Sequence, residues 1–168
     1  MGSPVVLFVF NDPATQWKSL TGSSATAAPC TPLMGLVSDG NGDVSLNGVG
    51  TATPISYGGN TINCYASSGS TLVVGKGKTP NFSFLVVDGS SSSTAYFLCG
   101  LALKPIGASP SPGGNFPGLS VATATNGATT LTMADKGKAA GTWDFWVLAQ
   151  NAGRDLGLID PLITNNDQ

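Results

Sequence analysis

A turn near residue 40 holds the residues best suited to bind a ligand. The segment 39–45 reads DGNGDVS and carries side-chain oxygens at alternate positions. This spacing is typical of the opening of an oxygen-rich calcium loop. An EF-hand is excluded, because that motif requires glycine where Val44 stands. Two interpretations stay open: a solvated hairpin turn, which is favoured, and a surface loop in which Asp39, Asn41 and Asp43 bind calcium or contact a sugar.

The aromatic segment 142–149 is the second candidate. If it is a strand, Trp143 and Phe145 share one face, and Asp144 and Trp146 share the other. The rings of Trp143 and Trp146 would suit a sugar, because the face of an aromatic ring is an apolar platform. The favoured alternative is that these rings belong to the hydrophobic core, where each would bury a large apolar area.

Nothing else in the sequence has the composition of a catalytic site. The chain contains no histidine, which removes the usual general base of serine and cysteine hydrolases and the commonest zinc ligand. No lysine follows a serine at a motif spacing. A catalytic pair of carboxylates cannot be recognised from sequence when every acidic residue is an aspartate beside turn residues. We therefore expect no enzymatic activity, no catalytic residues and no cofactor, apart from the calcium considered above.

The chain carries few charges. Seven basic residues oppose nine acidic ones, the net charge is −2, and charged residues make up 10% of the sequence. The basic residues are scattered, so the chain lacks the basic surface that binding to a nucleic acid requires. A surface with so few charges favours self-association, as a homo-oligomer or a dense assembly.

The apolar run at residues 5–10 is too short for a membrane span or for the apolar region of a signal peptide. No basic residue precedes it. We therefore expect a strand here, no membrane span and, by default, a cytoplasmic protein.

The three cysteines, Cys30, Cys64 and Cys99, are widely spaced and fit no metal-ligand pattern. Buried free thiols are the favoured interpretation, because a free cysteine behaves as a small apolar residue. Whether any two of them form a disulfide stays open.

Composition and turn chemistry predict an all-β fold. Glycine occurs 23 times, proline occurs 11 times, and there is no glutamate. Aspartate prefers caps and turns, whereas glutamate favours helix interiors. The only helical signal is a single turn opened by Asp12 and Pro13. We expect one domain, residues 1–168, built as a single antiparallel β-sandwich of about ten short strands, Ig-like or jelly-roll-like.

Short apolar segments bounded by turn residues give the expected elements. Strands are predicted at 5–10, 62–66, 71–76, 82–87, 96–103, 142–149 and 156–164, a hairpin at 119–133 with its turn at 126–127, further turns at 39–42, 47–48 and 58–60, and a proline-rich loop of open role at 105–117.

The C-terminal residues resemble a known family. Residues 143–150 read WDFWVLAQ, a short turn follows, and the last segment holds Asp160, Pro161 and Ile163 in an Asp-Pro-x-Ile pattern. This arrangement is similar to the closing strands of the AidA/PixA inclusion-body proteins and the related DP-EP family. The resemblance implies a β-sandwich that accumulates in bacterial cells and has no established catalytic activity. From the residues alone, Asp160 and Pro161 are more simply the start of a strand.

Two functions follow as hypotheses. The first is a non-enzymatic, self-associating protein of the inclusion-body type, whose partner is itself. The alternative is a lectin-like, carbohydrate-binding module assisted by calcium, which would use Asp39, Asn41 and Asp43 together with an aromatic platform.

Overall fold

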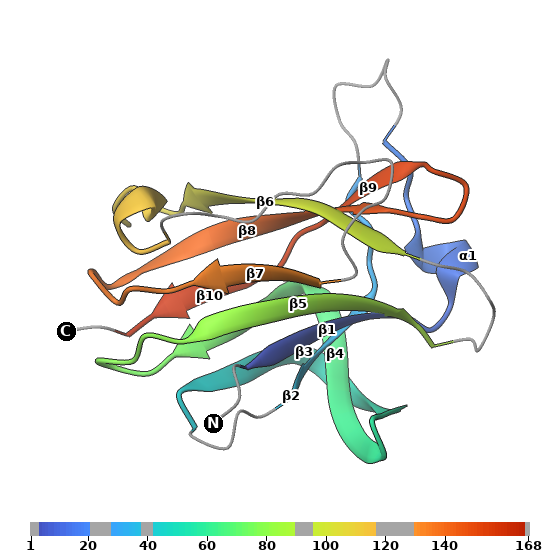
Figure 1. Ribbon diagram of the computed structural model, residues 1–168, viewed down its shortest axis with the longest axis horizontal. Helices are drawn as coiled ribbons and strands as arrows, with labels where there is room; N and C mark the ends of the chain where they lie inside the picture. Colours follow the sequence, from blue (N-terminus) through green and yellow to red (C-terminus); the bar gives the residue numbers. More distant parts are fainter. Residues whose placement is uncertain (1–3, 21–27, 38–41, 90–95, 117–129, 167–168) are drawn as a thin grey trace.

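The computed structural model describes residues 4–20, 28–37, 42–89, 96–116 and 130–166 (Figure 1). These residues form ten strands, one four-residue helix and one short 3-10 turn, so the expectation of an all-β fold is confirmed. In chain order the elements are β1 (Val5–Phe10), α1 (Pro13–Gln16), β2 (Leu33–Val37), β3 (Val44–Tyr57), β4 (Asn60–Val74), β5 (Asn81–Asp88), β6 (Phe97–Pro105), η1 (Pro112–Gly114), β7 (Thr130–Ala134), β8 (Gly141–Gln150), β9 (Leu156–Ile159) and β10 (Leu162–Asn165).

The strands belong to one mixed sheet. Its order is β6-β8-β10-β4-β2-β1-β5-β7, with β3 beside β4 and β9 beside β8. The sheet curls until Cα atoms of its end strands, β6 and β7, come within 8 Å of each other. The fold is therefore barrel-like, with the strands arranged around a common interior (Figure 1).

The expected sandwich needs two corrections. Its two facing layers are opposite walls of one curled sheet, and two neighbouring pairs, β1 with β5 and β10 with β4, are parallel. Antiparallel pairs follow from tight turns, which the sequence shows, whereas a parallel pair requires a long crossover connection. Three other strands lie between β1 and β5 along the chain, and no local signal specifies that arrangement.

Aromatic side chains form the centre of the barrel interior. Phe8, Phe84 and Phe145 come from three different strands, and all are fully buried. The ring centroids of Phe8 and Phe84 lie 6.4 Å apart, and those of Phe84 and Phe145 lie 5.5 Å apart. Such ring pairs add to the stabilisation that comes from burying their large apolar area.

The strand expected at residues 5–10 is confirmed, including its burial on both faces. Val6 and Phe8 point into the barrel interior. Leu7 and Val9 point to the outside, where they form a second buried cluster with Cys64. β1 lies between β2 and β5, which explains why it is apolar throughout: neither face meets water.

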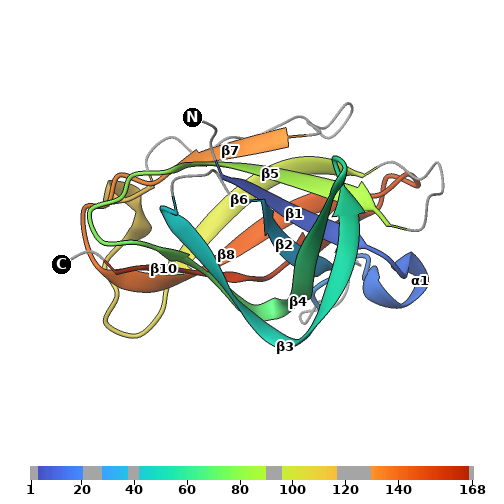
Figure 2. The same ribbon diagram turned by 90° about the horizontal axis from the view of Figure 1, so that it is seen from below.

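β3 and β4 form one long hairpin, in which β4 belongs to the barrel wall between β10 and β2 and β3 pairs with β4 off the main strand order (Figure 2). The expected turn at 58–60 is confirmed, because Gly58 and Gly59 have φ angles of 58° and 81°, which a tight two-residue hairpin turn requires. The separate strands expected at 62–66 and 71–76 form one strand, β4, which ends at Val74, so the second was predicted two residues too long.

The turn expected at 47–48 is wrong, because these residues lie within β3. The ring of Tyr65 lies against the backbone of Gly48, and a Cβ atom there would stand 2.1 Å from Tyr65 Cγ. Glycine is thus needed at this position for the close approach of a ring from the neighbouring strand.

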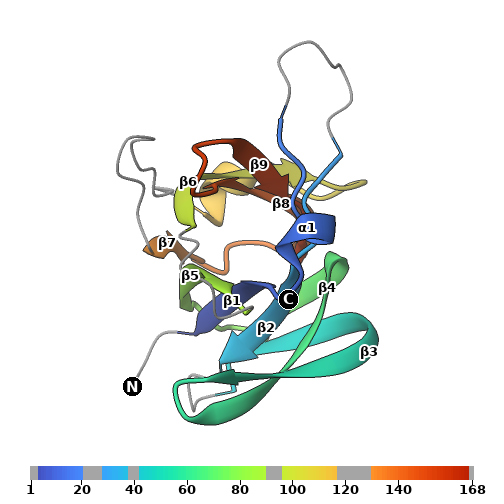
Figure 3. The same cartoon turned by 90° about the vertical axis from the view of Figure 1, so that its right-hand side faces the viewer.

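The expected helical turn is present as α1, at one end of the barrel (Figure 3). Pro13 occupies a first-turn position, and the backbone amide of Gln16 donates to the carbonyl oxygen of Asp12 at 3.0 Å. The turn and first strand of the hairpin expected at 119–133 lie outside the described residues. Its return strand is β7, which pairs with β5.

The described part of the 105–117 loop is bound to the barrel. The carbonyl oxygen of Pro110 accepts a hydrogen bond from Trp143 Nε1 at 2.8 Å. Phe116 packs edge-on against the same indole, with 5.3 Å between the ring centroids. The buried Asn115 side chain accepts the backbone amides of Lys138 and Ala139 and donates to the Ala139 carbonyl. The loop therefore closes one end of the core.

Candidate functional site

The β3–β4 hairpin carries no charged residue, a property it shares with residues 105–134. No aspartate, glutamate, lysine or arginine occurs between Asp43 and Lys76. β4 is part of the barrel wall and β3 pairs with it off the main strand order (Figure 2), and Val49 on β3 is 47% exposed. A surface without charges lacks the repulsion that keeps copies of a protein apart. A count of charges along the sequence would have found this segment, which the sequence analysis did not single out.

β3 is an open edge strand. Among the described strands it pairs with β4 alone, so no strand satisfies the backbone groups along its other side. Residues 44–47 are in regular register with residues 71–74 of β4, but the register then shifts twice before Thr53. Beyond these shifts, Pro54 has no backbone N–H to donate. Residues 53–57 return to regular register but include this proline, so 44–47 is the longest part of the open edge with regular register and no proline.

Natural proteins protect an open edge with lysines, prolines, bulges or a cover. In β3 the register shifts and Pro54 protect the distal half, whereas residues 44–47 read VSLN and have no charged side chain. Val44 and Leu46 pack against the barrel core, while Ser45 and Asn47 are exposed. The edge at 44–47 is thus held firmly by the core and left open to solvent.

The distal half of the hairpin is held by the outer cluster. Ile55, Tyr57 and Ile62 pack against the buried Leu7, Val9 and Cys64. β2 and β4 approach each other closely at Gly35 of β2, where a Cβ atom would stand 2.5 Å from the sulfur of Cys64. Gly35 and Cys64 are partners in the antiparallel pairing of β2 with β4, so this close packing lies within the barrel wall.

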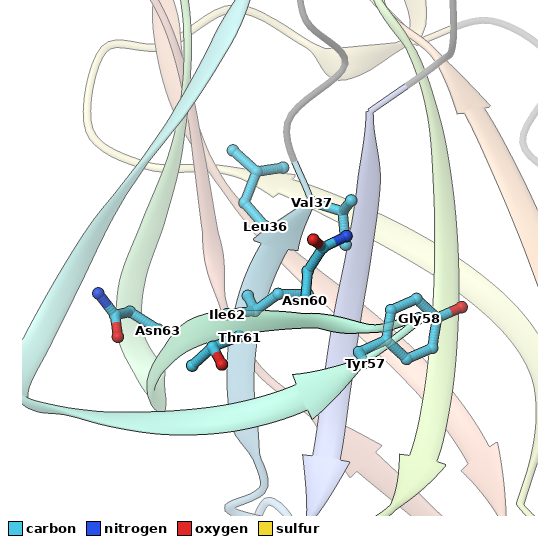
Figure 4. Close-up of a pocket in the computed structure, with 8 residues that line it drawn as sticks. All are labelled: Leu36, Val37, Tyr57, Gly58, Asn60, Thr61, Ile62 and Asn63. Atoms are coloured by element: carbon cyan, nitrogen blue, oxygen red, sulfur yellow. The ribbon is translucent and has the colours of Figure 1, made fainter.

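A hollow of about 630 Å³ lies beside the hairpin tip, within the range of small-ligand sites. Leu36, Val37 and Ile62 line it, and in Figure 4 the Asn60 side chain points toward the two residues from β2 while Tyr57 extends toward β5. None of the lining residues that the structure describes is charged. A hollow lined by apolar and amide groups, with no charged group, is suited to bind an uncharged segment of polypeptide.

The predicted calcium loop is only partly described. Asp39 and Asn41 lie outside the described residues. Asp43 forms an ion pair with Lys78 at 3.4 Å between Oδ1 and Nζ, and its carbonyl oxygen accepts the amide of Gly75 at 2.9 Å. No group of three or more acidic or cysteine side chains that would hold a metal occurs in the part of the chain that the structure describes. Calcium binding at this loop stays a prediction.

The two candidate platform residues lie on opposite faces of β8. Trp143 is fully buried in the barrel, so the core interpretation is confirmed for this residue. Trp146 is half-buried on the outer face, where it lines a shallow, mainly apolar depression of about 230 Å³ with Ala102, Leu148 and Leu158. The two rings therefore cannot form one platform.

The Asp-Pro-x-Ile residues lie where β9 meets β10. Ile163 is fully buried, and the carbonyl oxygen of Pro161 accepts the amide of Phe145 at 3.1 Å. Burial raises the pKa of the Asp160 carboxyl, and the nearby Asp144 raises it further. The oxygen Oδ1 of Asp160 is buried and has no hydrogen-bond partner in the described residues. These contacts fit the strand-boundary interpretation.

All three cysteines are buried free thiols, as the sequence analysis favoured. Burial raises the pKa of Cys64 to about 11, and it also raises the pKa of Cys30 and of Cys99. A raised pKa leaves little thiolate at neutral pH, which makes these residues poor nucleophiles.

Comparisons with known proteins do not place the chain in a family. The sequence matches no protein-family model, and no curated protein is significantly similar to it. In the described residues, no helix has the length and hydropathy needed to cross a membrane.

Proposed function

We propose that this protein is a non-enzymatic β-protein whose copies associate through the open edge of β3. The observation that carries the proposal is the regular edge at 44–47, which is unpaired among the described strands and lies in a hairpin without a charged residue. Self-association of this kind agrees with the resemblance of its C-terminal residues to the inclusion-body proteins.

A second copy of the chain is the partner that the edge suits best. Two β3 strands related by a twofold axis would pair antiparallel, with each edge supplying the same groups to the other. Backbone hydrogen bonds would then give the affinity, as in other cases of strand addition. Pairing would bury no charged side chain of the edge, so the desolvation cost is low.

Sedimentation velocity over about 1 µM to 1 mM tests the proposal on the full chain. We expect the wild type to shift from monomer to dimer or larger species as the concentration rises. The substitution Asn47→Lys places an exposed charge on the edge, and we expect it to raise the midpoint concentration at least about tenfold.

Asn81→Lys is the matched control, because Asn81 is also an exposed strand asparagine but lies on β5. Both substitutions change the net charge equally, so a difference between them reports on the edge and not on overall charge. A wild type that stays monomeric throughout the range, or equal behaviour of the two variants, would contradict the proposal.

A further inference from the structure

A second hollow, of about 360 Å³, has Pro13 and Ala14 of α1 in its lining. α1 lies at one end of the barrel (Figure 3). The walls of the hollow come from α1, from the residue preceding β6 and from the turn after β8, and none of them belongs to the hairpin. Trp17, Tyr96 and Asn151 are its large side chains. The volume is in the range of sites that bind small molecules.

Two aromatic rings form one wall of this hollow. The ring centroids of Trp17 and Tyr96 lie 5.8 Å apart with an angle of 38° between the planes. Phe10, which is fully buried, supports both from behind, stacked on Tyr96 at 4.7 Å and tilted against Trp17 at 5.5 Å. The rings are therefore fixed in place before any ligand arrives, which lowers the entropic cost of binding.

Hydrogen bonds connect the aromatic wall to the opposite wall. Trp17 Nε1 donates to Ser19 Oγ at 2.9 Å, and Ser19 Oγ donates in turn to Asp155 Oδ2 at 3.3 Å. On the facing turn, Asn151 Oδ1 accepts the backbone amide of Asp155 at 2.9 Å. This chain of contacts fixes the width of the hollow and the orientation of Asn151.

Two residues that line the hollow have a polar group without a hydrogen-bond partner among the described residues. Asn151 Oδ1 already accepts a hydrogen bond, but Asn151 Nδ2 has no acceptor among the described residues. The Tyr96 hydroxyl likewise makes no hydrogen bond within the described part of the chain. Burial and the nearby Asp88 raise the pKa of Tyr96 to about 12, so the hydroxyl keeps its proton at neutral pH.

The chemistry of the walls selects the class of ligand. No residue lining the hollow is charged, so a charged ligand would lose water without gaining a counter-charge. A wholly apolar ligand would leave the Asn151 and Tyr96 polar groups unpaired. A suitable ligand is neutral, with one apolar face for the rings and hydroxyl groups along its edge.

We propose that this hollow binds the ring of a neutral sugar. The apolar C–H face of a pyranose would lie on Trp17, and its hydroxyl groups would bond with Asn151 Nδ2 and the Tyr96 hydroxyl. The site is independent of the β3 edge and uses neither the predicted calcium loop nor Trp146.

The test is a two-stage binding experiment on the full chain. An array of neutral, sialylated and sulfated glycans identifies a binder, and an NMR titration with the corresponding neutral monosaccharide locates it through the three tryptophan indole signals. We expect neutral glycans to bind without added calcium and the Trp17 indole signal to shift. A blank array, binding that requires calcium, or a preference for charged glycans would overturn the proposal.

Single substitutions test which residues bind the sugar. Tyr96→Phe removes only the hydroxyl, and we expect it to weaken binding about three- to tenfold while the fold stays intact. Trp17→Ala should abolish binding. Trp146→Ala is the matched control on the outer face of β8, and it should bind as the wild type does. Loss of binding in the Trp146→Ala control or full binding in Tyr96→Phe would overturn the sugar assignment. Adenosine serves as a neutral comparison ligand, and equally tight binding of adenosine would also overturn it.

Discussion

β8 and β3 are both long strands with alternating exposure, but they are held in the fold in different ways. β8 pairs on both sides, with β6 on one and with β9 and β10 on the other, and every second side chain from Trp143 to Ala149 is fully buried. Among the described strands β3 pairs with β4 alone, and none of its residues reaches full burial. Stability is therefore concentrated around β8, whereas β3 retains backbone groups that another chain can pair with.

The contrast shows that the stability of the barrel and the availability of backbone groups for pairing depend on different strands in this fold. Strand register and burial specify the barrel, while in our proposal an absence of charge on an open edge specifies where copies meet. Mutations in the two regions should accordingly affect different measurements: the free energy of unfolding for the barrel, and the association midpoint for the hairpin.

The largest expected effect is loss of a ring from the barrel core. Phe145→Ala should lower the free energy of unfolding by about 3–5 kcal/mol, because it removes a fully buried ring that contacts Phe84. Ile55→Ala, at a half-buried hairpin position, should cost less than half as much. Urea unfolding measures both, and equal costs would contradict the contrast between the two regions.

Adding a methyl group where β2 contacts β4 should have the next largest effect on the free energy of unfolding. Gly35→Ala places a Cβ atom 2.5 Å from Cys64 Sγ, and overpacking of this kind should cost about 1–3 kcal/mol in the free energy of unfolding. Gly100→Ala is the control, because nothing lies within 4 Å of the added atom and the position is also in a strand. A Gly35→Ala variant as stable as the control would show that the hairpin is not packed closely on β2.

Alkylation of the cysteines compares local opening in the two regions. Cys64 lies on β4 in the outer cluster, where Ile55 and Tyr57 of β3 pack against that cluster, whereas Cys30 belongs to the barrel core. The outer cluster is the smaller of the two, so it should open without global unfolding. Iodoacetamide under native conditions, followed by mass spectrometry, should therefore modify Cys64 faster than Cys30. The reverse order would mean that the barrel end opens first.

The smallest expected effect is a pH dependence at Asp160. Its pKa is raised in the folded protein, so the folded state holds this proton more tightly than the unfolded state does. The contribution to stability is then fully present below the ordinary value of 3.8 and is lost as the pH rises through the folded pKa. Relative to Asp160→Asn, the wild type should become more stable as the pH falls from 7 toward about 4. A difference that does not change with pH would contradict this.

Local patterns predicted the barrel strands well. The run 5–10 is β1, the segment 82–87 lies within β5, and the expected burial of Trp143 is correct. These predictions succeeded because continuous apolar runs and alternation depend only on which faces are buried. The order of strands and the parallel pairs were not predictable, since they depend on contacts between distant segments.

The hairpin was harder to predict for a related reason. Glycine at residue 48 suggested a turn, but its actual role is to accommodate the ring of Tyr65 from the neighbouring strand. The hollow at Trp17 and Tyr96 was also missed, because its residues are far apart in sequence and meet only at the end of the barrel. Sites assembled from such distant segments leave no local motif.

Hydrogen–deuterium exchange at low and high protein concentration tests the central claim most directly. If copies associate through the open edge, the backbone amides of residues 44–47 should gain protection as the concentration rises. Amides of β8, which is already paired on both sides, should exchange at the same rate at both concentrations. Exchange at 44–47 that does not depend on concentration, in a sample that sedimentation shows to be associated, would contradict the account.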